Sequence, residues 1–192
     1  MRNRDDRVST VPTREPRDSA LRAPHSAFDV LAVIEALEGA GVACWVDGGW
    51  GVDALVGEQT RAHDDLDLVI ALDAAARARG ALAPLGFALA IDELPTRFVL
   101  RAAGDRRIDF HPVTFDEAGN GRQRLPGRRS FSYTAEGLSA WGTIGGRPVR
   151  CVSAALQVAC HRGYEPDEAD RHDMRLLRRR FGLTLPPPYD AP

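Results

Sequence analysis

The sequence predicts a mixed α/β (α+β) fold: a mixed sheet flanked by helices, followed by a small helical part at the C-terminal end. Helical and strand patterns alternate from Ser26 to about residue 83, a hairpin pair and a second short β region follow, and the last forty residues carry only helical patterns. With 192 residues, 44% apolar and 27% charged, the chain has the size and composition of one globular core with a small attachment.

The N-terminal segment, residues 1–25, mixes Arg, Asp, Pro, Ser and Thr without periodicity and is expected to be a disordered tail. Ser26 is placed to cap the first helix, whose apolar residues recur at helical spacing as Phe28, Leu31, Ile34 and Leu37 before Gly39 and Gly41. The next predicted elements are a strand at Val42–Val46, a Gly48-Gly49 turn, a helix at Trp50–Val56 closed by Gly57, and a strand at Leu66–Leu72.

The second half of the chain begins with a helix rich in Ala and Arg, which Asp73 is expected to cap and which stops before Pro84. The elements expected after it are a hairpin of Arg97–Arg101 and Arg107–Val113, a polar loop at Gly119–Arg129, a β region turning at Gly145-Gly146, and helices at Ser153–Arg162 and Asp167–Arg180 ending at Gly182. We therefore divide the chain into a tail (1–25), a core (26–152) and a C-terminal helical segment (153–192).

The charge composition excludes several function classes. All 25 basic residues are Arg, and 27 acidic residues leave a net charge of -2, which does not favour a protein that mainly coats nucleic acid. Without Lys the chain has neither a complete Walker A motif nor Schiff-base chemistry. Its three cysteines form no close pair, and no apolar run serves as a leader or a membrane span. We expect a cytoplasmic monomer or homodimer.

Two acidic residues in one predicted strand are the first chemical signal. Because side chains alternate along a strand, Asp65 and Asp67 share one face, about 7 Å apart at the ~3.4 Å rise of a strand. Their repulsion favours a cation between them, and oxygen ligands suit Mg²⁺. Asp109 and His111 share a face of a later strand, so Asp109 is a candidate third carboxylate. Such a set can hold a magnesium nucleotide and deprotonate a hydroxyl.

The Gly48-Gly49 turn is the second signal. Glycines let the backbone approach phosphates, and the helix that follows offers N–H groups and the positive end of its dipole. Arg61 and His63 are close enough in sequence to add counter-charge. Each element alone is usually structural, and Trp50 is more often a core residue than a stacking platform; the combination in this order is more specific.

These residues resemble the polymerase-β-type nucleotidyltransferase superfamily and, within it, the lincosamide nucleotidyltransferases. The resemblance runs from about Asp29 to Leu177 through the segments Trp45 to Asp53, Arg61 to Leu68, Pro95-Thr96-Arg97, Ile108 to Pro112, Cys151-Val152-Ser153, His161 to Tyr164 and His172-Asp173. The aminoglycoside adenylyltransferases are similar mainly in the first two segments. The superfamily's usual Gly-Ser turn is Gly49-Trp50 here, which removes a hydroxyl contact to phosphate; the antibiotic branch is similar in this respect.

The resemblance implies a nucleotidyltransferase fold, Mg²⁺ held by Asp65, Asp67 and Asp109, Asp109 as the base, and the triphosphate of ATP at Gly48, Gly49 and Trp50. His111, His161 and Tyr164 are the candidate acceptor-binding residues, although a helix-capping role for His161 and Tyr164 stays open. Charge does not choose the acceptor, but the lincosamide likeness does, because it continues into His161–Tyr164 and His172-Asp173. The alternatives are an aminoglycoside acceptor, a toxin that modifies protein or tRNA, and a non-catalytic nucleotide-binding module.

Overall fold

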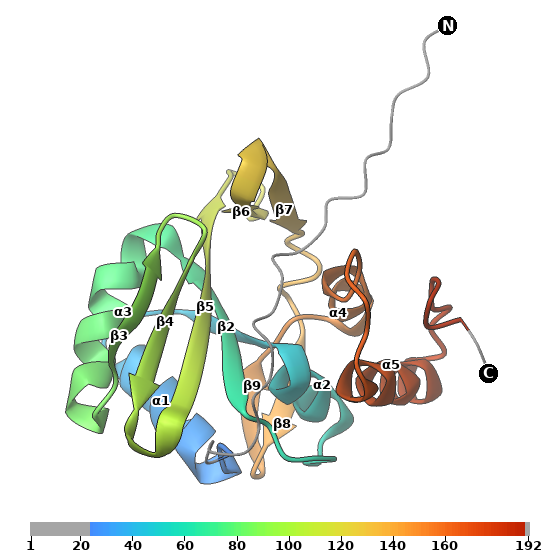
Figure 1. The fold of residues 1–192 in the computed structure, drawn as a ribbon, viewed down its shortest axis with the longest axis horizontal. Helices are drawn as coiled ribbons and strands as arrows, with labels where there is room; N and C mark the ends of the chain where they lie inside the picture. The colour runs from blue at the N-terminus through green and yellow to red at the C-terminus, as the bar shows by residue number, and fades with distance from the viewer. Residues whose placement is uncertain (1–23, 191–192) are drawn as a thin grey trace, which may run out of the picture.

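The computed structural model describes residues 24–190 and has the predicted mixed α/β class (Figure 1). The helices are α1 (Ala27–Gly39), α2 (Gly48–Val56), α3 (Ala75–Leu82), α4 (Ala154–Cys160) and α5 (Glu168–Phe181). The strands are β1 (Cys44–Asp47), β2 (Asp65–Ala71), β3 (Ala88–Glu93), β4 (Arg97–Ala102), β5 (Arg106–Phe115), β6 (Gly121–Arg124), β7 (Ser130–Tyr133), β8 (Trp141–Ile144) and β9 (Arg147–Arg150).

Seven strands form one sheet with the central order β1-β2-β5-β4-β3, extended by β6 on β5 and by β7 on β6. Only the β2–β5 pair is parallel, so the sheet is mixed, as predicted. The remaining two strands, β8 and β9, form a separate hairpin that turns at Gly145-Gly146 and packs against α2.

Several helix ends follow from the sequence as predicted. Ser26 caps α1 through a capping box with Asp29, and Asp167 caps α5 in the same way with Asp170. Gly57 and Gly182 end α2 and α5 with φ of 92° and 65°, a conformation that glycine adopts without steric cost.

Three sequence-based assignments were wrong. Asp73 lies in a 3-10 turn, and Ala74 precedes α3 without a side-chain cap. The edge strand β3 was missed because its residues are mostly exposed and show no apolar alternation. The predicted loop Gly119–Arg129 contains β6, which extends the sheet through backbone hydrogen bonds although its residues are Gly, Arg and Gln. Pairing with β5 therefore decides its structure, not side-chain propensity.

The two faces of the sheet bury different cores. On one face α1 and α3 cover the main core, which includes Leu66, Leu68, Ile108 and Phe110. The alternate residues, among them Val69 and Val113, belong to a second cluster with Phe131, Tyr133, Leu138 and Leu156. In Figure 1 the sheet accordingly separates α1 and α3 from α4 and α5. The carboxylates of interest alternate with the main-core residues and so lie on the side of α4.

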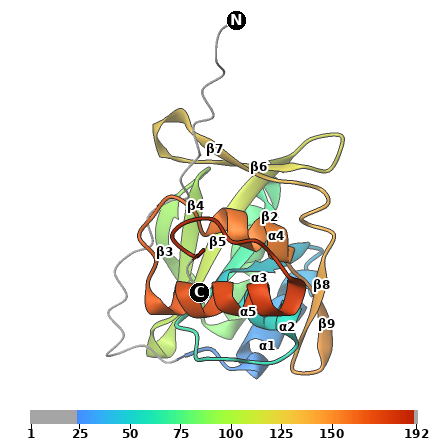
Figure 2. The ribbon, with the colours of Figure 1, turned by 90° about the vertical axis from the view of Figure 1, so that its right-hand side faces the viewer.

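The C-terminal helices pack onto α2, not only onto each other. Met174 and Leu177 of α5 are fully buried in a third cluster with Val52 of α2 and Val158 of α4. Figure 2 shows α5 lying across this side of the molecule with the sheet behind it. No helix within residues 24–190 has the length and apolar content needed to cross a membrane.

Residues 1–23 of the predicted tail lie outside the described residues. His25, which was assigned to that tail, is only 1% exposed. Its backbone N–H donates to the His63 carbonyl at 3.1 Å, and its Nε2 lies 2.8 Å from the Arg107 carbonyl oxygen. The packed structure therefore begins before Ser26.

Candidate active site

Three carboxylates stand in one row across neighbouring strands. The antiparallel register of β1 and β2 places Asp47 beside Asp67, and the parallel register of β2 and β5 places Asp67 beside Asp109. Asp65, two residues earlier on β2, stands beside Arg107. The sheet thus brings Asp109 next to the Asp65/Asp67 strand, as the sequence analysis expected of a third acid. Asp47 was not expected in this row.

Asp109 is held by two arginines at one of its two oxygens. Arg97 Nη1 and Arg107 Nη2 donate to Asp109 Oδ2 at 3.2 and 3.1 Å. Asp109 Oδ1 is buried and has no hydrogen-bond partner among residues 24–190. Burial raises the pKa of the Asp109 carboxyl, an effect that the charges of His111, Arg97 and Arg107 oppose. Because a buried acceptor is rarely left unsatisfied, Oδ1 is the atom that a ligand is expected to meet.

Asp67 has His111 as its neighbour. His111 Nε2 lies 3.3 Å from Asp67 Oδ1, and the other ring nitrogen lies 3.2 Å from Gln123 Nε2. The Gln123 amide also donates to the Thr96 carbonyl at 2.9 Å, which fixes its orientation. Burial opposes protonation of His111, but its hydrogen bond with Asp67 and the charges of the three carboxylates raise its pKa to about 9. His111 therefore lies beside the carboxylate row and interacts with it through Asp67.

Asp47 is the most enclosed of the three acids. Its Oδ1 accepts from the Gly48 N–H at 2.8 Å, and Tyr133 Oη donates to its Oδ2 at 3.3 Å. Burial raises the pKa of the Asp47 carboxyl, and the nearby Asp67 charge raises it further. Asp47 caps α2 and thereby fixes the start of that helix beside Asp67.

The two glycines at the start of α2 are required by their neighbours. A Cβ on Gly48, which has φ of 59°, would collide with the Asp67 carboxylate. A Cβ on Gly49 would collide with the side chains of Arg61 and His63. The structure therefore brings Gly48, Gly49, Arg61 and His63 together at the first turn of α2, where backbone N–H groups suit an anion.

Arg61, His63 and Trp50 each have protein partners at this place. Arg61 forms a bidentate pair with Asp173 of α5, and the His63 ring contacts the Asp53 carboxylate. Trp50 is 2% exposed, belongs to the main core and packs on the His63 ring at 4.7 Å between centroids. The Trp50 ring is thus a core element.

His161 and Tyr164 lie at and just after the end of α4, where the charge of His161 is near enough to lower the pKa of Asp47. His161 is buried at the end of α4, with Nδ1 2.8 Å from the Gln157 carbonyl oxygen and Nε2 3.8 Å from Asp170 Oδ1. The rings of His161 and Tyr164 are 6.5 Å apart between centroids. These contacts are compatible with the helix-capping role that the sequence analysis left open, and the acceptor-binding role stays a prediction.

The carboxylates fit a divalent cation by their chemistry. Within residues 24–190 no three His, Cys or acidic side chains form a ready-made metal cluster. Asp67 and Asp109 nevertheless stand side by side, and the unpartnered Oδ1 of Asp109 is a hard oxygen donor of the kind that Mg²⁺ prefers. Asp65 follows the same strand face.

Sequence reasoning missed four members of this site. Arg97 and Arg107 contact Asp109, Gln123 contacts His111, and Asp47 stands beside Asp67. Asp47 and Arg97 lie in segments quoted for the resemblance, but neither was given a role. The signal available for Arg107 was its position two residues before Asp109, which puts both on one strand face. Gln123 gave no signal because its strand was taken for a loop.

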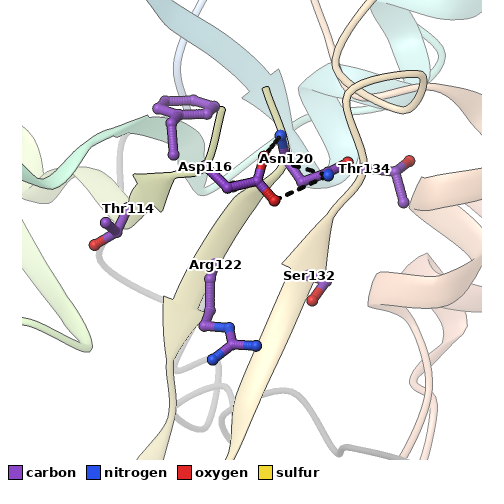
Figure 3. Close-up of a pocket in the computed structure, with 8 residues that line it drawn as sticks. Thr114, Asp116, Asn120, Arg122, Ser132 and Thr134 are labelled. Carbon is purple, nitrogen blue, oxygen red and sulfur yellow. Dashed lines mark hydrogen bonds between the residues drawn. The ribbon is translucent and has the colours of Figure 1, made fainter. Parts of the chain in front are cut away.

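A pocket of about 510 Å³ lies elsewhere, at the end of β5 and the β6–β7 hairpin (Figure 3). Thr114, Arg122 and Ser132, paired across the three strands, line it together with Asp116, whose carboxylate accepts from Asn120. Thr114 alternates with Val113 and therefore points away from the face that carries Asp109 and His111. The pocket is separate from the carboxylate row.

The chain is similar to several known proteins. Residues 29–177 match the family model for aminoglycoside-2''-adenylyltransferase. A lincosamide resistance protein from Staphylococcus haemolyticus is 27% identical over 150 residues, 78% of this chain and 92% of the relative. A 2''-aminoglycoside nucleotidyltransferase from Escherichia coli is 36% identical over 110 residues, 57% of each chain.

Solved structures give the same two likenesses. The lincomycin-bound lincosamide antibiotic adenylyltransferase LnuA has a TM-score of 0.73 and 25% identity, covering 81% of this chain and 98% of its own. The structure of ANT(2'')-Ia in complex with adenylyl-2''-tobramycin has a TM-score of 0.63 and 25% identity, covering 80% of this chain and 87% of its own.

Proposed function

This chain belongs to the aminoglycoside-2''-adenylyltransferase family of antibiotic nucleotidyltransferases, and we propose that it transfers an adenylyl group from ATP to a hydroxyl of a lincosamide. The observation that carries the transfer chemistry is the register of β2 and β5, which sets Asp67 beside Asp109, whose Oδ1 meets no hydrogen-bond partner in the described part of the chain. Adenylylation of a drug hydroxyl gives resistance because it removes that hydroxyl from the drug's own contacts.

In the proposed reaction the hydroxyl oxygen forms a bond to the α-phosphorus of ATP. The bond between that phosphorus and the bridging oxygen of the β-phosphate breaks, and pyrophosphate leaves with its electron pair. Asp109 Oδ1 takes the hydroxyl proton, and Arg97 and Arg107 hold the opposite oxygen so that Oδ1 keeps its direction. Asp65 and Asp67 would hold Mg²⁺, which when bound neutralises phosphate charge.

The first turn of α2 is the proposed triphosphate site. Gly48 and Gly49 have no side chains of their own, and Arg61 and His63 lie directly against Gly49, so the positive end of α2 and a guanidinium meet at one place. The turn is also adjacent to the acids, because a Cβ on Gly48 would touch the Asp67 carboxylate. A triphosphate at this turn therefore brings its α-phosphate toward the carboxylate row.

Coverage supports the lincosamide as acceptor. The match to the lincosamide resistance protein spans 92% of that protein, and the LnuA likeness spans 98% of its chain with the higher TM-score. An aminoglycoside is the second candidate, favoured by the family model and by 36% identity over the shorter aligned stretch.

The test is mass spectrometry of lincomycin, clindamycin, kanamycin and tobramycin after incubation with the protein, Mg²⁺ and each nucleoside triphosphate in turn. We expect lincomycin and clindamycin to gain one adenylyl group with ATP, and the Asp67→Asn variant to add none. Modification of kanamycin or tobramycin alone would overturn the acceptor and leave nucleotidyl transfer standing. Absence of any adduct with all four drugs would overturn the proposed function.

A further inference from the structure

Helix α5 reaches from the C-terminal segment into the first turn of α2. Asp173 accepts two hydrogen bonds from one guanidinium, from Arg61 Nε at 2.9 Å and from Arg61 Nη2 at 2.6 Å. Asp173 is 0% exposed, and Arg61 Nη1 donates in addition to the Ala62 carbonyl at 3.1 Å. Because a bidentate pair fixes both the distance and the plane of a guanidinium, Asp173 determines where the Arg61 charge lies.

That charge is held against Gly49. The three atoms nearest to a Cβ built on Gly49 are Arg61 Nη2 and two atoms of the His63 ring. Asp173 contributes none of them, so the cationic end of the pair is the end that faces the start of α2. The ion pair is therefore oriented with its positive side toward the proposed phosphates.

A second contact ties the same loop to α5. His172 Nε2 lies 3.2 Å from Thr60 Oγ1, and Thr60 donates to Asp53 Oδ1 at 2.6 Å. The other Asp53 oxygen contacts the His63 ring. Consecutive residues of α5 thus hold both Arg61 and, through Thr60 and Asp53, His63.

The platform that carries Asp173 is itself fixed. The neighbouring Met174 and the following Leu177 are fully buried against α2 and α4, and the capping box at Asp167 secures the start of α5. A long Arg side chain loses much conformational freedom when it meets a ligand, and that cost is reduced when the side chain is already held in place.

We propose that Asp173 is a positioning residue for the nucleotide: it holds the Arg61 guanidinium over Gly49 so that the triphosphate meets a preset cation. The inference rests on the proposed function only in taking the first turn of α2 as the triphosphate site. It assigns part of α5 to the nucleotide, although the sequence likeness in His172-Asp173 had pointed to the acceptor.

The experiment measures the Kd of the non-hydrolysable analogue α,β-methylene-ATP with Mg²⁺ by calorimetry, without acceptor, for the wild type, Asp173→Asn, Arg61→Gln and the double variant. We expect each single variant to weaken nucleotide binding by roughly tenfold, the effect of one lost charge-assisted contact. In turnover assays KM for ATP rises in proportion, while kcat and KM for the drug stay within about twofold.

The double variant separates positioning from packing. Its two introduced amide side chains can hydrogen-bond to each other without charge, so a purely structural pair would recover both melting temperature and nucleotide affinity. We expect recovery of the melting temperature alone, because the cation over Gly49 is still missing. Arg147→Gln is the matched control, since it removes a 2.6 Å pair between β9 and Glu38 of α1, and neither residue is among the nearest neighbours of a Cβ on Gly49; its nucleotide Kd should equal that of the wild type.

Two results would overturn the proposal: unchanged nucleotide affinity in Asp173→Asn, or an affinity that the double variant restores. If Asp173→Asn does not fold, the Kd of the nucleotide analogue for the double variant and for Arg61→Gln tests the proposal instead. Because calorimetry needs no acceptor, a wild type that binds the analogue but modifies no drug would count against the proposed function and leave this inference testable.

Discussion

Two buried aspartates, each paired with arginine, differ in how their oxygens are used. On β5, Asp109 accepts from two arginines at Oδ2, while its Oδ1 has no hydrogen-bond partner within the residues that the structure describes. On α5, Asp173 has both oxygens engaged by the single guanidinium of Arg61. A carboxylate with one saturated and one vacant oxygen is oriented for a ligand, whereas one with both oxygens engaged can only orient its partner. Burial and charge alone do not distinguish these two roles.

The largest loss of activity is expected for Asp67→Asn, which removes the acid that stands beside Asp109. We expect turnover to fall by at least about 10³-fold with the fold intact, because charge neutralisation at the transferring phosphate is a major part of phosphoryl-transfer catalysis. Asp65→Asn should behave in the same way. Steady-state kinetics together with circular dichroism checks this, and near-normal activity in both variants would remove the metal assignment.

The next largest effect is expected when Asp109, the acid that the two arginines orient, is replaced. Asp109→Asn should lower kcat by about 10²- to 10⁴-fold, the usual worth of a positioned base, while the Kd for α,β-methylene-ATP changes much less. A collapse of nucleotide affinity with normal turnover of the bound complex would show instead that Asp109 is only a ligand.

Arg97→Gln tests whether orientation of Asp109 matters apart from its presence. Arg107 still holds Oδ2 in this variant, so we expect kcat to fall by about tenfold, with a stability change of about 1 kcal/mol or less for a partly exposed arginine. Thermal melting and kcat measured on one preparation separate the two effects. Equal loss of stability and activity would mean that Arg97 supports packing only.

The smallest expected effect concerns His25, which contacts the backbone of Arg107. Burial lowers the pKa of His25 below 6.5, and its Nδ1 is buried without a partner, so the folded protein binds this proton less readily than the unfolded chain. Its contribution to stability is therefore complete above pH 6.5 and is lost as the pH falls below that value, at no more than about 1.4 kcal/mol per pH unit. Chemical denaturation between pH 5 and 7.5 should show a shallower pH dependence in His25→Gln; an unchanged slope would contradict this.

Prediction from the sequence succeeded where a local pattern of residues determines the structure. Side-chain alternation predicted that Asp67 shares a face of its strand with Asp65, and that Asp109 shares a face of its strand with His111. Ser26 predicted the start of α1, and Gly182 predicted the end of α5. It failed where a distant partner decides the outcome. Strand β6 exists because β5 offers it hydrogen bonds, and Asp173 reaches Arg61 only because α5 packs on α2.

For the residues near Gly49, the role of each side chain was harder to predict from the sequence than its position. The structure brings Arg61 and His63 to Gly49 as expected, but local sequence could not reveal that both already have acidic partners. Likewise the apolar surroundings that bury Trp50 come from several segments, including β8–β9 far along the chain. Placement of these side chains follows from tertiary packing, which a single sequence window does not contain.

The Arg61–Asp173 pair joins residues 112 positions apart, and this separation bears on synthesis in the cell. During translation, the Gly48-Gly49 turn, strands β2 and β5 and Arg61 are synthesised before α5. Until then the loop at residues 57–64 lacks its contacts with α5. A chain that ends before residue 173 therefore contains every acid of the row but leaves Arg61 without its anchor, so we expect a late truncation to weaken nucleotide binding although all the acids are present.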